Sequence, residues 1–189
     1  MGLFTVDGRD VPMCYVSGRN GTAELKPSVV FFSYHSYTSK RKAGFHWLAD
    51  AYRKANWQVA FVTVGYSWLS LSKDFSDHPS NQWFQSDDGV LCYVWKPLFH
   101  PINLRCGVLN ELSKPLFRAY AHLPMREIDA QVKRAHQIVI ESSAGVILLR
   151  RLQRLNPRAR FIYRVSDDVR AMGAHPVIEA KEQRLWRGI

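Results

Sequence analysis

The sequence contains no apolar run of about 18 residues, the length that a membrane-spanning helix requires. Its first residues include Asp7 and Asp10 and no apolar core segment, so they do not resemble a secretory signal peptide. The three cysteines, Cys14, Cys92 and Cys106, are odd in number and widely spaced, which argues against a disulfide framework. They form no Cys-x-x-Cys pair, which argues against a zinc site. These absences predict a protein that is either cytoplasmic or peripheral to a membrane.

The sequence also lacks a glycine-rich phosphate loop and any RNP, helix-turn-helix or zinc-finger pattern. What it has in excess is positive charge: 26 lysines and arginines stand against 16 aspartates and glutamates, a formal net charge of +10. A positive surface favours nucleic acid, anionic lipid headgroups or phosphorylated substrates, and charge alone does not choose among them. With 189 residues, 47% of them hydrophobic, the chain can build one core of ordinary domain size.

Apolar runs and helical periodicities alternate along the chain. Continuous apolar runs predict buried strands at residues 28–33, 57–64, 136–141 and 160–165. Amphipathic spacing predicts helices at residues 43–56, 108–120, 125–135, 143–155 and 178–186. This order predicts an α/β domain with a Rossmann-like, doubly wound and mostly parallel sheet.

Local signals refine this plan. Asp87-Asp88-Gly89 indicates a type I′ or bulged turn between two short strands at residues 83–85 and 90–95. Pro115 should start or kink the second half of its helix. Three arginines of the helix at residues 143–155 are expected to point outward: Arg150, Arg151 and Arg154.

The predicted Rossmann-like domain covers residues 27–175. Residues 1–26 carry scattered glycines and Pro12 without periodicity, which predicts a loose N-terminal extension. Residues 176–189 are expected to begin an interdomain helix or linker. Because the chain stops soon after a site-like loop and before any further strand, this ending indicates a truncated protein.

Three polar segments follow predicted parallel strands: residues 34–42, Glu141-Ser142 and Ser166-Asp167-Asp168. Open α/β sheets bind ligands at the carboxyl ends of their strands, so these segments should share one crevice. Taken alone, Ser166-Asp167-Asp168 is more typical of a helix cap or a turn than of a catalytic site.

Several separate blocks of this sequence resemble one enzyme family in the same order. They are Ser33-Tyr34-His35 followed by Arg41-Lys42-Ala43 and His46, residues 89–95, residues 100–103, Phe117-Arg118 with Tyr120, Glu141-Ser142, and Asn156-Pro157 leading to residues 163–167. Together they span residues 30–168 and are more specific than any one short motif. They resemble the β-glucuronosyltransferases of xanthan assembly, the GumK-type enzymes of glycosyltransferase family 70.

The resemblance implies the N-terminal, acceptor-binding half of a two-domain GT-B enzyme, with the C-terminal nucleotide-sugar domain absent and the chain inactive alone. It implies inverting transfer of glucuronic acid from UDP-glucuronate to a polyprenyl-diphosphate-linked oligosaccharide in exopolysaccharide biosynthesis. Such an enzyme should be peripheral at the cytoplasmic face of the inner membrane. The UDP-sugar donor would be a co-substrate, and neither a metal cofactor nor a nucleic-acid partner is expected.

The resemblance also assigns site residues. It places the catalytic base at Asp167, since inverting transfer needs a carboxylate that removes the proton of the acceptor hydroxyl. Asp168 stands where the family is expected to have glycine, so the location of the base is better defined than its identity. The residues expected to bind substrate are His35, Arg41, Lys42, His46, Glu141, Ser142 and Asp168.

Simpler interpretations of these residues stay open at this point. His35 is otherwise a hydrogen-bonded loop residue, and Glu141 is otherwise a surface carboxylate. The basic cluster of Lys40, Arg41 and Lys42 is either an ordinary solvated loop or a site for a diphosphate or an acidic headgroup.

A tryptophan-leucine segment also has two interpretations. Trp68, Leu69 and Leu71, followed by Lys73, belong either to the core, which is the commoner case, or to an apolar patch at a membrane interface. For the whole protein, the alternative function is a non-catalytic, basic Rossmann-like module that binds an anionic membrane or nucleic acid.

Overall fold

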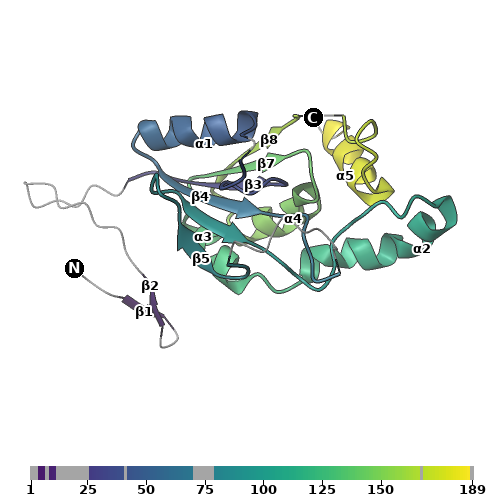
Figure 1. Cartoon of the computed structure of the whole chain (residues 1–189), viewed down its shortest axis with the longest axis horizontal. Coiled ribbons are helices and arrows are strands. Elements are labelled where there is room, and N and C mark those ends of the chain that lie inside the picture. Colours follow the sequence, from purple (N-terminus) through teal and green to yellow (C-terminus); the bar gives the residue numbers. More distant parts are fainter. Residues whose placement is uncertain are drawn as a thin grey trace, which may run out of the picture.

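The computed structural model describes residues 4–6, 9–11, 26–40, 42–69, 79–166 and 168–187. Its centre is a six-stranded sheet with the order β5-β6-β4-β3-β7-β8 (Figure 1). All neighbouring strands are parallel except β5, which pairs with β6 in the antiparallel sense. The strands are β3 Ser28–Ser33, β4 Gln58–Thr63, β5 Trp83–Gln85, β6 Leu91–Val94, β7 Gln137–Glu141 and β8 Arg160–Arg164.

The strand order reverses direction between β3 and β7. From β3 the chain builds outward through β4 to β6, and it then returns to the other side of β3 to form β7 and β8. Such a reversal is a topological switch point, where the connections leave β3 and β7 in opposite directions and open a crevice at the carboxyl ends. The predicted fold class, a Rossmann-like and mostly parallel sheet, is therefore confirmed.

Helices cover both faces of this sheet. Helix α1, Gly44–Lys54, packs Phe45 and Ala49 on one face, against Phe31 of β3 and Phe61 of β4. The opposite face carries α2 Gly107–Arg118, the 3-10 helix η2 Ala119–His122, α3 Arg126–Arg134, α4 Gly145–Leu155 and α5 Pro176–Trp186. Because side chains alternate along a strand, β3 sends Phe31 to the first layer and Phe32 to the second.

The predicted elements are all present, with ends that differ by a few residues. The hairpin between β5 and β6 resolves the choice of turn: Gly89 has φ +86°, whereas neither Asp87 nor Asp88 has a positive φ. A type I′ turn would need positive φ at both central residues. The loop is therefore the bulged alternative, closed by hydrogen bonds from Gly89 N–H to the Ser86 carbonyl and from Ser86 N–H to the Val90 carbonyl.

Two sequence-based expectations need comment. Helix α2 runs through Pro115, so its second half does not start there as a new helix. Arg151 does not point outward, because its guanidinium pairs with Asp129 at 2.6 Å and donates to the carbonyls of Ala121 and Leu123. This arginine therefore joins α4 to η2 and α3, while Arg150 and Arg154 are exposed as predicted.

The ends of the chain add little to the sheet. Within the predicted N-terminal extension, the structure describes a short antiparallel pair, β1 Phe4–Val6 and β2 Arg9–Val11, and Lys26. Helix α5 packs against α2 and α4, so this segment is part of the folded domain. None of the helices in the described part of the chain has the length and apolarity needed to cross a bilayer.

Candidate functional site

A buried carboxylate stands at the switch point. Glu141 is the last residue of β7 and only 5% exposed. Its Oε2 accepts a hydrogen bond from Ser33 Oγ at 2.6 Å and from Tyr34 N–H at 3.4 Å, and its Oε1 accepts one from Ser166 Oγ at 3.2 Å. Both oxygens thus accept hydrogen bonds from donors at the ends of two other strands, β3 and β8. The interpretation of Glu141 as a surface carboxylate is therefore wrong.

The serines after β7 connect this edge to α4. Ser143 Oγ donates to the Glu141 carbonyl and accepts from Gly145 N–H, each at 3.2 Å. Ser143 therefore links the end of β7 to Gly145, the first residue of α4. Ser142 Oγ lies 3.4 Å from the Arg164 carbonyl and accepts from Ser166 N–H at 3.3 Å. Ser142 and Ser143 are both buried.

The segment after β8 contributes to the same edge. Ser166 reaches Glu141 and Ser142, so the segments after β7 and β8 meet at this edge of the sheet. Asp168 is exposed, and its Oδ1 accepts a hydrogen bond from Arg170 N–H at 2.8 Å, as a turn residue does. Asp167 lies outside the described residues.

Helix α5 supplies a second carboxylate that sequence reasoning missed. Glu182 is buried, and its Oε1 accepts hydrogen bonds from Tyr163 Oη at 2.5 Å and from Ser142 Oγ at 3.3 Å. Burial, together with the hydrogen bond to Glu182, raises the pKa of the Tyr163 phenol. Glu182 stands between Lys181 and Gln183, so the sequence pattern gave no signal that it faces inward.

A guanidinium at the end of β8 was also missed. A Cβ added at Gly44, the first residue of α1, would lie 2.5 Å from Arg164 Nη2, so the absence of a side chain there makes room for Arg164. The Arg164 guanidinium also lies 5.8 Å from the centre of the Phe45 ring. Arg164 has no ion pair with any residue that the structure describes.

The loop after β3 presents aromatic side chains at the crevice. Tyr34 stacks on Tyr66 with 5.5 Å between ring centres, and it lies so close to Gly65 that a Cβ there would be 2.6 Å from the Tyr34 ring. His35 is exposed beside it, and its backbone N–H donates to Ser33 Oγ at 3.2 Å. Exposed ring faces of this kind suit the apolar face of a sugar.

The other basic residues of this loop have structural contacts. His46 is buried in α1: its Nδ1 accepts from Ala43 N–H at 3.0 Å and its Nε2 donates to the Ser36 carbonyl at 2.8 Å. Lys42 is exposed, donates to the Tyr37 carbonyl and lies 4.6 Å from the centre of the Tyr37 ring. Lys40 is exposed as well, and Arg41 lies outside the described residues.

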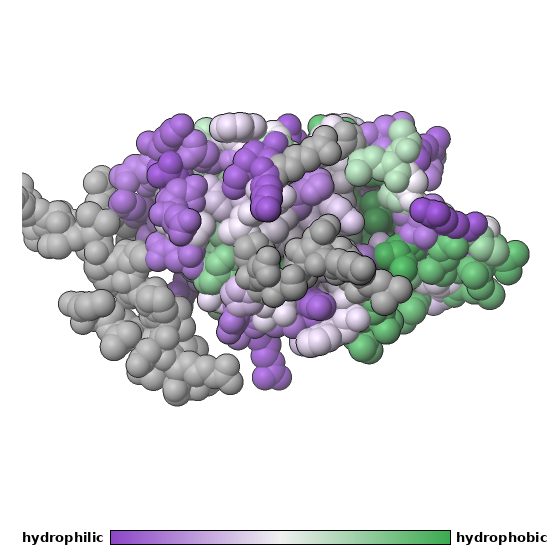
Figure 2. All heavy atoms as spheres, in the orientation of Figure 1, coloured by the Kyte–Doolittle hydropathy of each residue, from purple (hydrophilic) through white to green (hydrophobic). Residues whose placement is uncertain are grey.

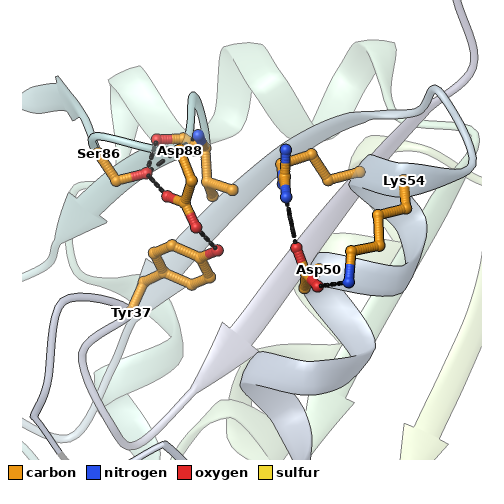
Figure 3. A network of polar contacts seen from close by, with 7 residues as sticks. Tyr37, Asp50, Lys54, Ser86 and Asp88 are labelled. Carbon is orange, nitrogen blue, oxygen red and sulfur yellow. Dashed lines mark hydrogen bonds and ion pairs between the residues drawn. The ribbon is translucent and has the colours of Figure 1, made fainter.

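A polar network fixes the far side of the loop (Figure 3). Tyr37 Oη donates to Asp88 Oδ2, and Ser86 Oγ donates to Asp88 Oδ1, each at 2.7 Å. Burial and the hydrogen bond to Asp88 raise the pKa of the Tyr37 phenol. The β5–β6 turn is therefore attached to the loop that follows β3, and the loop is held at both ends.

The fold and this edge define a class: a Rossmann-like domain with hydrogen-bonded polar side chains at its topological switch point. The family described as the N-terminal domain of glucuronosyltransferase GumK matches residues 31–189, and the chain belongs to this family. The UDP-glucuronate:glycolipid 2-beta-glucuronosyltransferase of Xanthomonas campestris pv. campestris is 28% identical over 163 residues, which cover 85% of the chain. The same match covers 40% of that relative, so the chain spans less than half of its length.

We expect Glu141→Gln to weaken the edge and to lower the free energy of unfolding by about 1–3 kcal/mol, because one of the buried donors loses its charged acceptor. Urea denaturation measures the loss, and amide hydrogen exchange should show faster exchange at Tyr34 and Ser166. Glu127→Gln on the exposed side of α3 is the control and should change stability by less than about 0.5 kcal/mol. Equal free energies of unfolding for Glu141→Gln and Glu127→Gln would show that the Glu141 carboxylate does not stabilise the ends of the strands.

We expect His46 to make the domain acid-sensitive. Burial lowers the pKa of His46, so the unfolded chain takes up a proton at a higher pH than the folded chain does. Stability is then complete above the ordinary histidine pKa of about 6.5 and declines as the pH falls below it. His46→Gln, whose amide can both accept and donate, should show a smaller loss of unfolding free energy between pH 7.5 and about pH 5. The exposed control His122→Gln should lose as much unfolding free energy between these two pH values as the wild type does. A loss in His122→Gln as small as that in His46→Gln would contradict this assignment.

Proposed function

We propose that the chain is the acceptor-binding part of an inverting, UDP-glucuronate-dependent glycosyltransferase. Its acceptor is an oligosaccharide linked to polyprenyl diphosphate, and its product belongs to exopolysaccharide biosynthesis. The relative's printed activity, glucuronosyl transfer from UDP-glucuronate to a glycolipid, supports a lipid-linked acceptor and a UDP-sugar donor. The proposed chemistry uses a carboxylate base and no metal.

One observation carries this proposal: the joined ends of β3, β7 and β8. Ser33, Glu141 and Ser166 meet at the switch point, where open α/β sheets bind their ligands. Asp167 directly follows Ser166 in the sequence, so the residue before the proposed base is tied to the sheet.

In the proposed reaction, the Asp167 carboxylate removes the proton from an acceptor hydroxyl while that oxygen attacks the anomeric carbon of glucuronate. The bond between this carbon and the phosphate oxygen breaks, UDP leaves with the bonding pair, and the configuration at the carbon inverts. Asp168 is the competing base, and its hydrogen bond to Arg170 N–H supports a role in the turn instead.

Cationic and aromatic groups at the crevice suit such substrates. Arg164 is a guanidinium without an ionic partner among the described residues, and guanidinium groups bind carboxylates and phosphates in a two-pronged geometry. Tyr34 and His35 offer exposed rings for stacking against a sugar. We assign Arg41 and Lys42 to the acidic part of the substrate, and His46 to holding their loop.

The proposal places the enzyme at the membrane through α2. Four apolar residues of this helix are between 49% and 72% exposed: Val108, Leu109, Leu112 and Leu116. Figure 2 shows hydrophobic residues gathered over α2. A lipid-linked acceptor stays in the bilayer, so an exposed apolar helix beside basic residues would bring the crevice to it. The cytoplasmic face of the inner membrane is the proposed location.

Another segment has the same character. Trp68 and Leu69 are 63% and 68% exposed, so the core interpretation is wrong for these two residues, while Leu71 and Lys73 lie outside the described residues. Lys96 Nζ lies 4.8 Å from the centre of the Trp68 ring. An exposed tryptophan with a cationic neighbour is typical of a membrane interface.

A second candidate function is a non-catalytic module that binds an anionic membrane or nucleic acid. The net charge of +10 favours it, because charge of this size produces a long-range attraction for polyanions. It predicts binding that weakens steeply with salt and does not depend on Asp167. Tight RNA or duplex binding without affinity for lipid would favour this module over the enzyme.

The first test is calorimetric titration of the chain with a synthetic lipid-linked trisaccharide and, separately, with UDP-glucuronate. We expect acceptor binding and little donor binding. For the base, the chain is fused to the remaining part of the Xanthomonas relative, and glucuronosyl transfer is measured. Asp167→Asn should lower kcat by about 10²–10⁴-fold, because a general base contributes that much.

Asp168→Asn is the matched control, since it removes the neighbouring carboxylate and should leave most of the activity. A larger loss in Asp168→Asn than in Asp167→Asn would transfer the role of base to Asp168. Turnover of UDP-glucuronate by the 189-residue chain alone, at ordinary enzyme rates, would contradict the proposed division of labour.

The membrane contact is tested by replacing Leu112 and Leu116 with glutamine. Loss of two exposed leucines should weaken partition into phosphatidylcholine–phosphatidylglycerol vesicles about tenfold, because apolar contact area drives interfacial binding. Vesicle flotation measures the bound fraction. Trp47→Gln is the control, since Trp47 is 66% exposed on α1, across the sheet. Unchanged partition of the leucine variant, or an equal loss in the control, would contradict the role of α2.

A further inference from the structure

A basic hollow lies between η2, α4 and α5, away from the strand ends. It has a volume of about 350 Å³ and is lined on its floor by Ala121 and Ile147. This volume is roughly ten times the space of about 30 Å³ that a water molecule occupies in the liquid. The basic residues that line the hollow are His122 and six lysine and arginine residues: Arg118, Arg150, Arg151, Arg154, Lys181 and Arg184.

Most of these charges lack a counter-charge. Arg151 is neutralised by Asp129 and takes no further part. Arg118, Arg150, Arg154, Lys181 and Arg184 form no ion pair with any residue in the described part of the chain. Like charges on neighbouring turns of a helix repel one another, and α4 and α5 each place two of them at this hollow. A folded protein tolerates this arrangement best when an anion binds there.

The carboxylates on the surrounding helices are engaged elsewhere. Glu111 of α2 pairs with Lys114, and Glu179 of α5 pairs with Arg170. Glu182 faces the opposite side of α5, toward Tyr163 and Ser142. Helix α4 contains no acidic residue. The hollow therefore has no internal anion among the side chains of these three helices.

The electrostatics agree with this geometry. Burial lowers the pKa of Lys181, and the charges of Arg150, Arg184 and Arg118 lower it further. An ammonium group that is both partly desolvated and surrounded by guanidinium groups gains most from a bound dianion. Guanidinium groups match phosphate oxygens in pairs, and four of the five free cations are arginines.

We propose that this hollow binds the phosphate or diphosphate group of a membrane lipid. Two lipids carry this chemistry, the polyprenyl diphosphate of the acceptor and the headgroup of an anionic phospholipid. The first source rests on the proposed function, whereas phosphate binding at the hollow does not. Helix α4 lines the hollow from Ile147 to Arg154, and no lining residue belongs to the hydrogen-bonded cluster around Glu141.

The test titrates the 189-residue chain with inorganic pyrophosphate by calorimetry. The double variant Arg150→Gln/Arg184→Gln should bind at least about tenfold more weakly, because it removes two guanidinium groups that would form charge-assisted hydrogen bonds to the phosphate oxygens. Arg150→Lys/Arg184→Lys should regain part of the affinity, since it restores charge without the two-pronged geometry. Unfolding midpoints of both variants confirm that they are folded, as expected for two exposed positions.

Lys133→Gln/Arg134→Gln, in the last turn of α3, is the matched control and also removes two positive charges outside the hollow. It should bind pyrophosphate within about twofold of the wild type, apart from the general screening of net charge. If Lys133→Gln/Arg134→Gln lost as much pyrophosphate affinity as Arg150→Gln/Arg184→Gln, the effect would come from net charge alone and the proposal would be overturned. Absence of pyrophosphate binding by the wild type would overturn it as well.

Vesicles identify the source. Binding is compared for phosphatidylcholine vesicles that contain either polyprenyl diphosphate or phosphatidylglycerol at equal surface charge. A larger loss with polyprenyl diphosphate in Arg150→Gln/Arg184→Gln assigns the acceptor lipid, and an equal loss assigns phospholipid headgroups in general. If the chain binds pyrophosphate but the fusion enzyme shows no glucuronosyl transfer, the proposed function is refuted and the proposal of phosphate binding at the hollow stands.

Discussion

The buried carboxylate of Glu141 is the interaction on which the candidate site depends. It stands where the sheet reverses its strand order, and its two oxygens gather donors that follow β3 and β8. A charged group with an exposed fraction of only 5% persists in a core because its hydrogen bonds offset desolvation. Hydrophobic contacts alone would leave three loops free to move, since they have no direction. The charge fixes these loops relative to one another.

The fold could be predicted from the sequence because its strands are buried on both faces. A continuous apolar run such as that of β3 is typical of a strand in a parallel sheet, because helices bury both faces of such a sheet. The hairpin was predictable from Gly89, although the type of turn depended on the backbone angles of Asp87 and Asp88. Arg151 was misplaced because helical periodicity gives the face of a side chain but not the length over which it can reach Asp129.

The candidate site was predictable in location and only partly in content. The rule that ligands bind at the carboxyl ends of parallel strands selects Glu141, Ser142 and Ser166 without any contact information. Glu182 and Arg164 escaped because their positions depend on how α5 and α1 pack. Predicted binding roles also differ in kind: His46 has backbone partners on both ring nitrogens, so any effect on substrate passes through the loop that it holds.

In the layer formed by α2, α4 and α5, exposed apolar residues lie on α2 and basic residues line the hollow at α4 and α5. Packing of the core does not require this separation. Its inner side chains, such as Phe117 and Leu148, already stabilise the sheet. Outer positions are free to vary, yet leucines gather along α2. Arginines without an ion pair to any residue that the structure describes gather between α4 and α5. Both arrangements cost stability, through exposed apolar area and through like-charge repulsion. Their coexistence on one layer is explained if lipid offsets both costs, with acyl chains at α2 and phosphate at the hollow.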